Sequence, residues 1–378
     1  MIPKRVQEIE LSGIRKMFEM ADDDALNLGL GQPDFQPPED VIEAYKNAMT
    51  DGYNGYGSTF GLEPLKEEIA DHLTRYRSDI TKDNIIITVG ATQAFKVTTE
   101  VLVDDSREVL YPEPGFVLYE PQIKLARGKP VSYPVLQENE FVPDLDDLEE
   151  RRTEETTAII LNSPGNPTGG VFPQEDVDRI IDWAQENDII IISDEVYEMM
   201  IYEGEHASFL NDDYDNVIGI NSFSKTFAMT GWRIGYLTTK EEWIEQLGKL
   251  HYYTIACPPN PTQHAVLYAM RNRMDFIEEM NKTFKERRDI IVDRLNEIPG
   301  FDCLKPRGAF YVFPSFDFDI TSKELAMKLL HNGVLTTPGS AFGKTGEGHL
   351  RFSYANSTEN IEAAMDIIEE VVADLDVE

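Results

Sequence analysis

Apolar runs alternate with amphipathic segments along most of this chain. The runs 84–89, 158–161 and 189–192 carry apolar side chains at nearly every position, which is typical of strands buried on both faces of a parallel sheet. Residues 172–187, between the last two runs, have a proline near their start and apolar residues at helical spacing. The order strand, helix, strand predicts a parallel α/β sheet with right-handed crossovers.

The pattern changes near Phe284. A long charged helix is expected from there through Leu295, followed by a hairpin over 308–313 and a terminal helix from Thr358. This order of elements predicts a smaller α+β unit. Because the 378 residues of the chain exceed what one core usually fills, we expect two domains.

Charge and composition narrow the classes of function. The chain has 69 acidic and 34 basic residues and a net charge of −35, which argues against binding to nucleic acid or to an acidic membrane surface. A high-salt cytoplasm is one explanation of this charge. The two cysteines and six histidines show no CxxC or HExxH spacing, so metal catalysis is unsupported. With no signal peptide and no apolar run long enough to span a bilayer, we expect a cytoplasmic protein.

Lys225 is the most informative residue of the chain. It lies in the segment 222–235, where Phe223, Phe227 and Met229 are its apolar neighbours. Apolar surroundings disfavour the ammonium form and lower the pKa of a lysine. An amine that loses its proton near neutral pH is a nucleophile toward carbonyl groups, which indicates a Schiff base. A buried lysine paired with a carboxylate is the alternative for this segment alone.

Polar residues follow the apolar runs, at the strand ends where ligands lie in open parallel sheets. Gly90, Ala91 and Thr92 lead from the first run into a helix, whose first amide groups can receive a phosphate. A helix cap without a ligand is the alternative. After the second run, the prolines and glycines of 162–170 fix a turn that presents Asn166, although turn chemistry alone explains many such loops.

Asp194 ends the third run and is expected to be poorly solvated, so its carboxylate needs a cationic partner. A protonated ring nitrogen suits this position, and Tyr197 can direct its hydroxyl to the same ring; a helix cap by Asp194 is the alternative. Ser222 and Arg233 can hold an anion beside Lys225. A phosphate, a charged ring nitrogen, a ring oxygen and an aldehyde together describe pyridoxal 5′-phosphate.

With this ligand in view, the sequence resembles the fold-type I pyridoxal-phosphate enzymes, and specifically the class I aminotransferases of the archaeal aspartate and aromatic kind. The similar segments are 12–16, 29–35, 56–57, 166–169, 222–235, 338–344 and 350–355. The resemblance implies a large domain with a mostly parallel seven-stranded sheet in an αβα sandwich, and a smaller α+β domain. The expected parts are an N-terminal arm with part of the small domain (1–45), a large cofactor-binding domain (46–280) and a C-terminal small domain (281–378).

The resemblance also implies roles for individual residues. Lys225 is expected to form the Schiff base and to carry the proton, and Asp194 is expected to pair with the ring nitrogen. Asn166 and Tyr197 correspond to the partners of the ring hydroxyl. The residues expected at the phosphate are Ala91 and Thr92 through their backbone amides, Ser222, Arg233 and Ser224, and Phe116 is expected to stack on the ring.

For the substrate, Arg351 resembles the arginine that binds the α-carboxylate, and Gly31 and Asn166 are expected to contact the same group. Tyr56 corresponds to a tyrosine that reaches the phosphate of the neighbouring subunit, so a homodimer is implied. The chain departs from the family at Ala256, where related enzymes often have a small hydroxyl residue. The resemblance therefore does not extend to a second phosphate contact across the subunits.

The resemblance implies an aminotransferase that works by a ping-pong mechanism between an L-amino acid, of the aspartate or aromatic type, and a 2-oxo acid such as 2-oxoglutarate. A carbon-sulfur β-lyase with the same cofactor, and a regulatory protein that binds the cofactor without turnover, are the alternatives. Arg15 or Lys16 could pair with the second carboxylate of a dicarboxylic substrate, or could be solvated helix charges.

Overall fold

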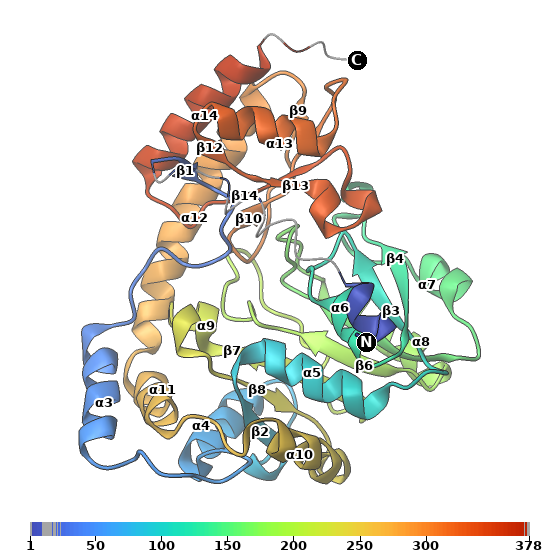
Figure 1. Cartoon of the computed structure of the whole chain (residues 1–378), viewed down its shortest axis with the longest axis vertical. Coiled ribbons are helices and arrows are strands. Elements are labelled where there is room, and N and C mark those ends of the chain that lie inside the picture. The colour runs from blue at the N-terminus through green and yellow to red at the C-terminus, as the bar shows by residue number, and fades with distance from the viewer. Residues whose placement is uncertain are drawn as a thin grey trace.

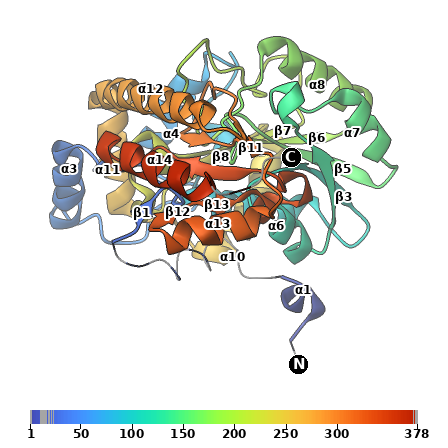
Figure 2. The same cartoon turned by 90° about the horizontal axis from the view of Figure 1, so that it is seen from above.

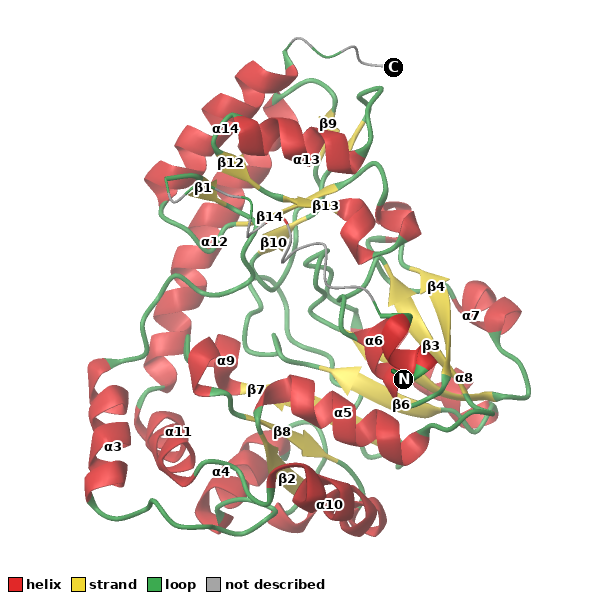
Figure 3. Cartoon of the chain, in the orientation of Figure 1, coloured by secondary structure: helices red, strands yellow, loops and turns green. Residues whose placement is uncertain are grey.

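A seven-stranded sheet forms the centre of the larger part of the molecule (Figures 1 and 3). The computed structural model of the chain describes residues 2–9, 17, 20, 22, 24–373 and 375. The sheet has the order β2-β8-β7-β6-β5-β3-β4. Its strands are β2 (Ile85–Thr88), β3 (Glu108–Glu113), β4 (Lys129–Pro134), β5 (Thr156–Asn162), β6 (Ile190–Asp194), β7 (Val217–Ser222) and β8 (Gly235–Thr238).

The sheet is mostly parallel, which confirms the predicted fold class. Strands β4, β3, β5, β6 and β7 run parallel to one another, whereas β8 is antiparallel to both β7 and β2. The expectation that the run 84–89 pairs as a parallel strand was therefore wrong. An apolar run indicates only that a strand is buried on both faces. Strand β2 is buried in this way although its neighbour β8 is antiparallel to it.

Helices cover both faces of the sheet. Ile159 and Leu161 of β5 pack in one core cluster with α4, α8 and α11, while Ala158 and Ile160 pack in another with α5, α6 and α10. Alternate residues of a strand point to opposite faces, so these two clusters make the αβα sandwich. The helices of this part are α3 (Glu39–Thr50), α4 (Glu63–Leu73), α5 (Gly90–Leu102), α6 (Tyr119–Leu125), α7 (Leu145–Arg151), α8 (Gln174–Glu186), α9 (Phe223–Thr226), α10 (Glu241–Ile255) and α11 (Asn260–Asn272). The predicted helix in 172–187 is confirmed as α8.

A separate hydrophobic core lies in the smaller part, at the top of Figure 1 and toward the viewer in Figure 2. It joins α12 (Met274–Glu297), α13 (Ser322–His331) and α14 (Thr358–Val372) to short strands, and β1 (Leu26–Asn27) brings the N-terminal region into it. The other strands are β9 (Phe301–Asp302), β10 (Tyr311–Val312), β11 (Ser315–Phe316), β12 (Val334–Leu335), β13 (Thr337–Pro338) and β14 (Leu350–Ser353). A short helix α1 (Lys4–Gln7) near the N-terminus lies at the edge of the molecule (Figure 2) and contacts α6.

Two expectations for this smaller part need correction. The long helix begins at Met274, well before the expected start, because its first turns are also buried: Ile277 packs in a core cluster of the larger part and Met280 in the core of the smaller part. The segment 308–313 does not form a hairpin: β10 pairs with β14, and β11 pairs with β9. The terminal helix from Thr358 is confirmed. Among the described residues, no helix has the length and apolar character to cross a membrane.

Candidate active site

A cavity of about 250 Å³ lies at the carboxyl ends of β5, β6 and β7, and β10 and β14 of the smaller part also contribute to its wall. Ligands of open α/β sheets bind at this edge. The cavity brings together most of the residues singled out in the sequence: Gly31, Ala91, Thr92, Phe116, Asn166, Asp194, Tyr197, Ser222, Ser224, Lys225, Arg233 and Arg351. These residues come from segments far apart in the chain, so their convergence is produced by the fold.

One end of the cavity is built to hold an anion. Helix α5 begins there at Gly90, whose φ of +72° is accessible to glycine and strained for other residues. A Cβ at this position would lie 2.6 Å from a guanidinium nitrogen of Arg233, so this side chain lies against the start of the helix. The Ser222 hydroxyl donates to the Ser224 hydroxyl at 2.9 Å on the same wall. Free helix amides, hydroxyls and a guanidinium are the donors that bind phosphate in proteins.

Asp194 lies at the end of β6, in the wall of the cavity, with 3% of its surface exposed. Burial raises the pKa of its carboxyl to about 6, although a hydrogen bond from the Tyr119 hydroxyl lowers the pKa in part. That bond joins Tyr119 Oη to Asp194 Oδ2 at 2.7 Å. In the neighbouring strand, Asn162 pairs in register with Asp194 and donates to its backbone oxygen at 2.9 Å. The carboxylate is therefore fixed in position, and a cation bound beside it in the cavity would stabilise its ionised form.

Lys225 is held by α9 with its amine in the cavity. Burial and the nearby charges of Arg351 and Arg233 lower the pKa of this amine to about 7. Its Nζ donates to the backbone oxygen of Gly31 at 2.5 Å. A lysine with this pKa has a large neutral fraction at physiological pH, as a nucleophile or a proton acceptor requires.

The apolar neighbours of Lys225 in the sequence do not line the cavity. Phe223, Phe227 and Met229 belong to the core on one face of the sheet. The rings of Tyr197 and Phe310 lie near the amine instead, with centroids 6.0 and 5.6 Å from Nζ. Desolvation lowers the pKa of Lys225, as predicted, but the side chains near its amine are not the apolar residues that precede and follow it in the sequence.

Arg351 lies on β14 in the wall contributed by the smaller part and is 2% exposed. One terminal nitrogen donates to Asn166 Oδ1 at 2.9 Å, and the other donates to the Gly29 backbone oxygen at 2.6 Å. Its Nε has no partner among the described residues. The guanidinium carbon lies 4.6 and 4.9 Å from the ring centroids of Tyr311 and Phe342. A fixed guanidinium with a spare donor suits a carboxylate.

Some predicted site residues lie elsewhere. The side chain of Tyr56 does not line the cavity of its own chain, and 93% of the residue's surface is exposed. Ala256 follows the end of α10 with a φ of +61°. Arg15 and Lys16 lie outside the described residues.

Three residues that line the cavity were not predicted as site residues from the sequence: Asn162, Tyr119 and Tyr311. Asn162 could have been found, because it ends an apolar run in the same way as Asp194. Tyr119 and Tyr311 carry no comparable signal, since each is defined by a partner that is distant in the sequence.

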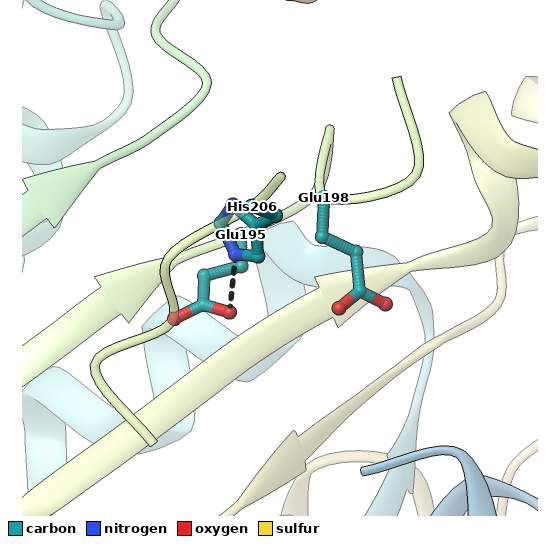
Figure 4. Close-up of side chains that lie close together, drawn as sticks. All are labelled: Glu195, Glu198 and His206. Carbon is teal, nitrogen blue, oxygen red and sulfur yellow. Dashed lines mark hydrogen bonds and ion pairs between the residues drawn. The ribbon is translucent and has the colours of Figure 1, made fainter. Parts of the chain in front are cut away.

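A second buried polar cluster lies next to the site and has the spacing of metal ligands. Glu195, Glu198 and His206 each place one ligand atom within 4.8 Å of the others (Figure 4). However, both oxygens of Glu195 already accept hydrogen bonds, one of them from His206 Nε2 at 2.9 Å and others from Ser208. A buried carboxylate satisfied in this way forms a structural ion-pair network.

Comparison with known proteins agrees with the fold. Residues 23–368 match the family of class I and II aminotransferases. The chain is 43% identical to the aspartate aminotransferase of Pyrococcus abyssi, over 97% of each chain. It is 39% identical to aromatic-amino-acid aminotransferase 2 of Thermococcus litoralis, also over 97% of each. The solved aromatic aminotransferase of Pyrococcus horikoshii superimposes with a TM-score of 0.90 at 40% identity, over 96% of this chain and 99% of that one.

The fold is that of an α/β transferase, and the chain belongs to the class I and II aminotransferase family. It is an amino-acid aminotransferase. The resemblance inferred from the motifs is therefore confirmed.

Proposed function

We propose that the cavity binds pyridoxal 5′-phosphate and that Lys225 is its covalent attachment point. The observation that carries this proposal is the convergence of Lys225, Asp194 and Arg351 on one cavity, with an anion-binding end beside them. The bound cofactor supplies an aldehyde for an amine and a ring that withdraws electrons. The protein then supplies binding, orientation and proton transfer.

The donors of the cavity fit this cofactor. The start of α5 and the side chains of Ser222 and Arg233 suit its phosphate, and Arg233 lies close to Gly90 at the start of this helix. Asp194 is buried with a raised pKa, so a protonated ring nitrogen stabilises its ionised form. The Tyr197 hydroxyl and the Asn166 amide suit the ring oxygen, and Phe116 offers an aromatic face.

The same residues of the cavity can bind the substrate and transfer the proton. Arg351 and the backbone of Gly31 bind the α-carboxylate of the substrate and fix its Cα near the Lys225 amine. Lys225 Nζ would accept the proton from that Cα and pass it to the former aldehyde carbon of the cofactor, and it would move a proton in the opposite direction when the acceptor is converted. Its pKa of about 7 suits both accepting and donating a proton near neutral pH. Asp194 keeps a proton on the ring nitrogen throughout.

We also propose that the active unit is a homodimer. Tyr56 is almost fully exposed on the isolated chain, and Tyr252 and Tyr253 at the end of α10 are exposed as well. Tyrosine is one of the residues that are enriched at protein–protein interfaces. In a dimer, Tyr56 contacts the phosphate in the neighbouring subunit. Sedimentation of Tyr56→Phe and of the wild type separates assembly from this contact, since the variant should remain dimeric while binding the cofactor less tightly.

For the substrate, we propose an amino donor of the aspartate or aromatic type with 2-oxoglutarate as acceptor. Relatives of similar identity are named for each donor, so a direct comparison is needed. Each purified donor is added without acceptor, and the cofactor absorbance is followed. Loss of the absorbance band with L-aspartate or an aromatic amino acid, and its return with 2-oxoglutarate, supports the proposal. Release of pyruvate and ammonia without acceptor contradicts it.

A further inference from the structure

Two tyrosine hydroxyls meet in the wall of the cavity. Tyr197 follows β6 in the larger part, and Tyr311 begins β10 in the smaller part. Their oxygens lie 2.8 Å apart, and their rings pack edge to face with centroids 5.8 Å apart. Both side chains are buried and line the cavity. A Cβ at Gly31 would lie 2.5 Å from Tyr311 Oη, so the hydroxyl also fills the space beside the Gly31 backbone.

The surroundings of the pair indicate which hydroxyl donates. The guanidinium of Arg351 lies 4.6 Å from the centroid of the Tyr311 ring, and a positive charge stabilises the phenolate form and so makes a hydroxyl a stronger donor. Burial raises the pKa of both tyrosines, and the charge of Arg351 lowers both. For Tyr311 this charge is the second-largest cause, whereas for Tyr197 it follows the charge and hydrogen bond of Tyr311, which raise the pKa of Tyr197 further. Tyr311 is therefore the better donor, and Tyr197 keeps its own proton for another acceptor.

We propose that Tyr311 is a positioning residue that directs the Tyr197 proton into the cavity, toward the ring oxygen of the cofactor, and that links this donation to the charge of Arg351. The inference rests on the proposed cofactor and extends it. A hydroxyl that accepts a hydrogen bond becomes a stronger donor itself. When a substrate carboxylate neutralises Arg351, Tyr311 donates less strongly, and the hydrogen bond from Tyr197 to the ring oxygen weakens. Substrate binding is thereby sensed at the cofactor.

The test is the variant Tyr311→Phe, which removes the hydroxyl but keeps the ring beside Arg351. The readout is the pH midpoint of the absorbance change of the bound cofactor, measured without substrate and with a saturating unreactive carboxylate such as maleate or 3-phenylpropanoate. The midpoint marks the loss of a proton that the ring oxygen shares with the Lys225 nitrogen. A hydrogen bond donated to the ring oxygen stabilises the form without this proton and therefore lowers the midpoint. The variant should raise the midpoint by about half a pH unit. The upward shift caused by the carboxylate should also become smaller.

Tyr354→Phe is the matched control, because Tyr354 is buried nearby and donates to the Ala309 backbone oxygen at 3.2 Å without lining the cavity. It should keep both wild-type midpoints. If Tyr311→Phe binds the cofactor and keeps both midpoints, the inference is wrong. If Tyr354→Phe shifts them equally, the effect is general to the core and the inference is also wrong. If the wild type shows no cofactor absorbance at all, the proposed function fails instead.

Discussion

The hydrogen bond from Tyr119 to Asp194 is the sharpest point at which to perturb the site. Both groups are buried, and the 2.7 Å distance indicates a strong bond to a charged acceptor. Such bonds contribute about 1.5–3 kcal/mol. Without the donor, the pKa of Asp194, which is about 6, should rise by a further one to two units, at about 1.4 kcal/mol per unit. A more basic carboxylate competes with the ring nitrogen for its proton.

The perturbation is Tyr119→Phe, which keeps the ring that packs against Phe95 and Phe116. We expect kcat to fall by about 10-fold to 100-fold, while KM for the amino donor changes little, since Arg351 is untouched. Tyr133→Phe is the control: its hydroxyl is equally buried and donates to a backbone oxygen at 2.7 Å, outside the cavity. Steady-state kinetics and thermal unfolding are compared for both. Wild-type kcat in Tyr119→Phe, or an equal loss in Tyr133→Phe, refutes the reasoning.

Other residues of the site and its surroundings can be tested in the same way. Arg351→Lys should raise KM for the donor more than about 10-fold, because a single ammonium replaces the two-pronged guanidinium; an unchanged KM would show that another residue binds the carboxylate. Reconstitution of the cofactor-free protein should accelerate with pH around a midpoint of about 7, the pKa of Lys225; a rate that is flat across neutral pH argues against a titrating amine. Burial lowers the pKa of His206, but the charge and hydrogen bond of Glu195 outweigh it and raise the pKa above its ordinary value. Stability from this pair is thus complete below about pH 6.5 and is lost as the pH rises through the folded-state pKa. Urea unfolding across this range should show the loss in the wild type and not in Glu195→Gln.

Much of the fold was predictable because its strands are buried on both faces. The isoleucine-rich runs that became β2, β5 and β6 needed no tertiary information. The direction of β2 did, because it depends on β8, which is about 150 residues later in the chain. The length of α12 was underestimated for a related reason. Its first turns are covered by core residues from distant segments, and this burial is not visible in a charged local sequence.

The site residues also differ in whether local sequence or a distant partner reveals them. Asp194 and Lys225 follow strands and stand out by their local context. Tyr119 acquires its importance from a residue 75 positions away, and Tyr311 from one 114 positions away. A tyrosine beside other aromatic residues is ordinary core composition in a sequence, and only the folded chain shows that its hydroxyl faces a functional group.

Attachment of the cofactor to Lys225 can be tested without any substrate. The purified protein is loaded with pyridoxal 5′-phosphate, reduced with borohydride, digested and analysed by mass spectrometry. We predict that the phosphopyridoxyl group is found on the peptide that contains Lys225, and that Lys225→Ala yields no labelled peptide from the site. Stoichiometric label on a different lysine, or labelling that persists in Lys225→Ala, would contradict the assignment of this cavity as the active site.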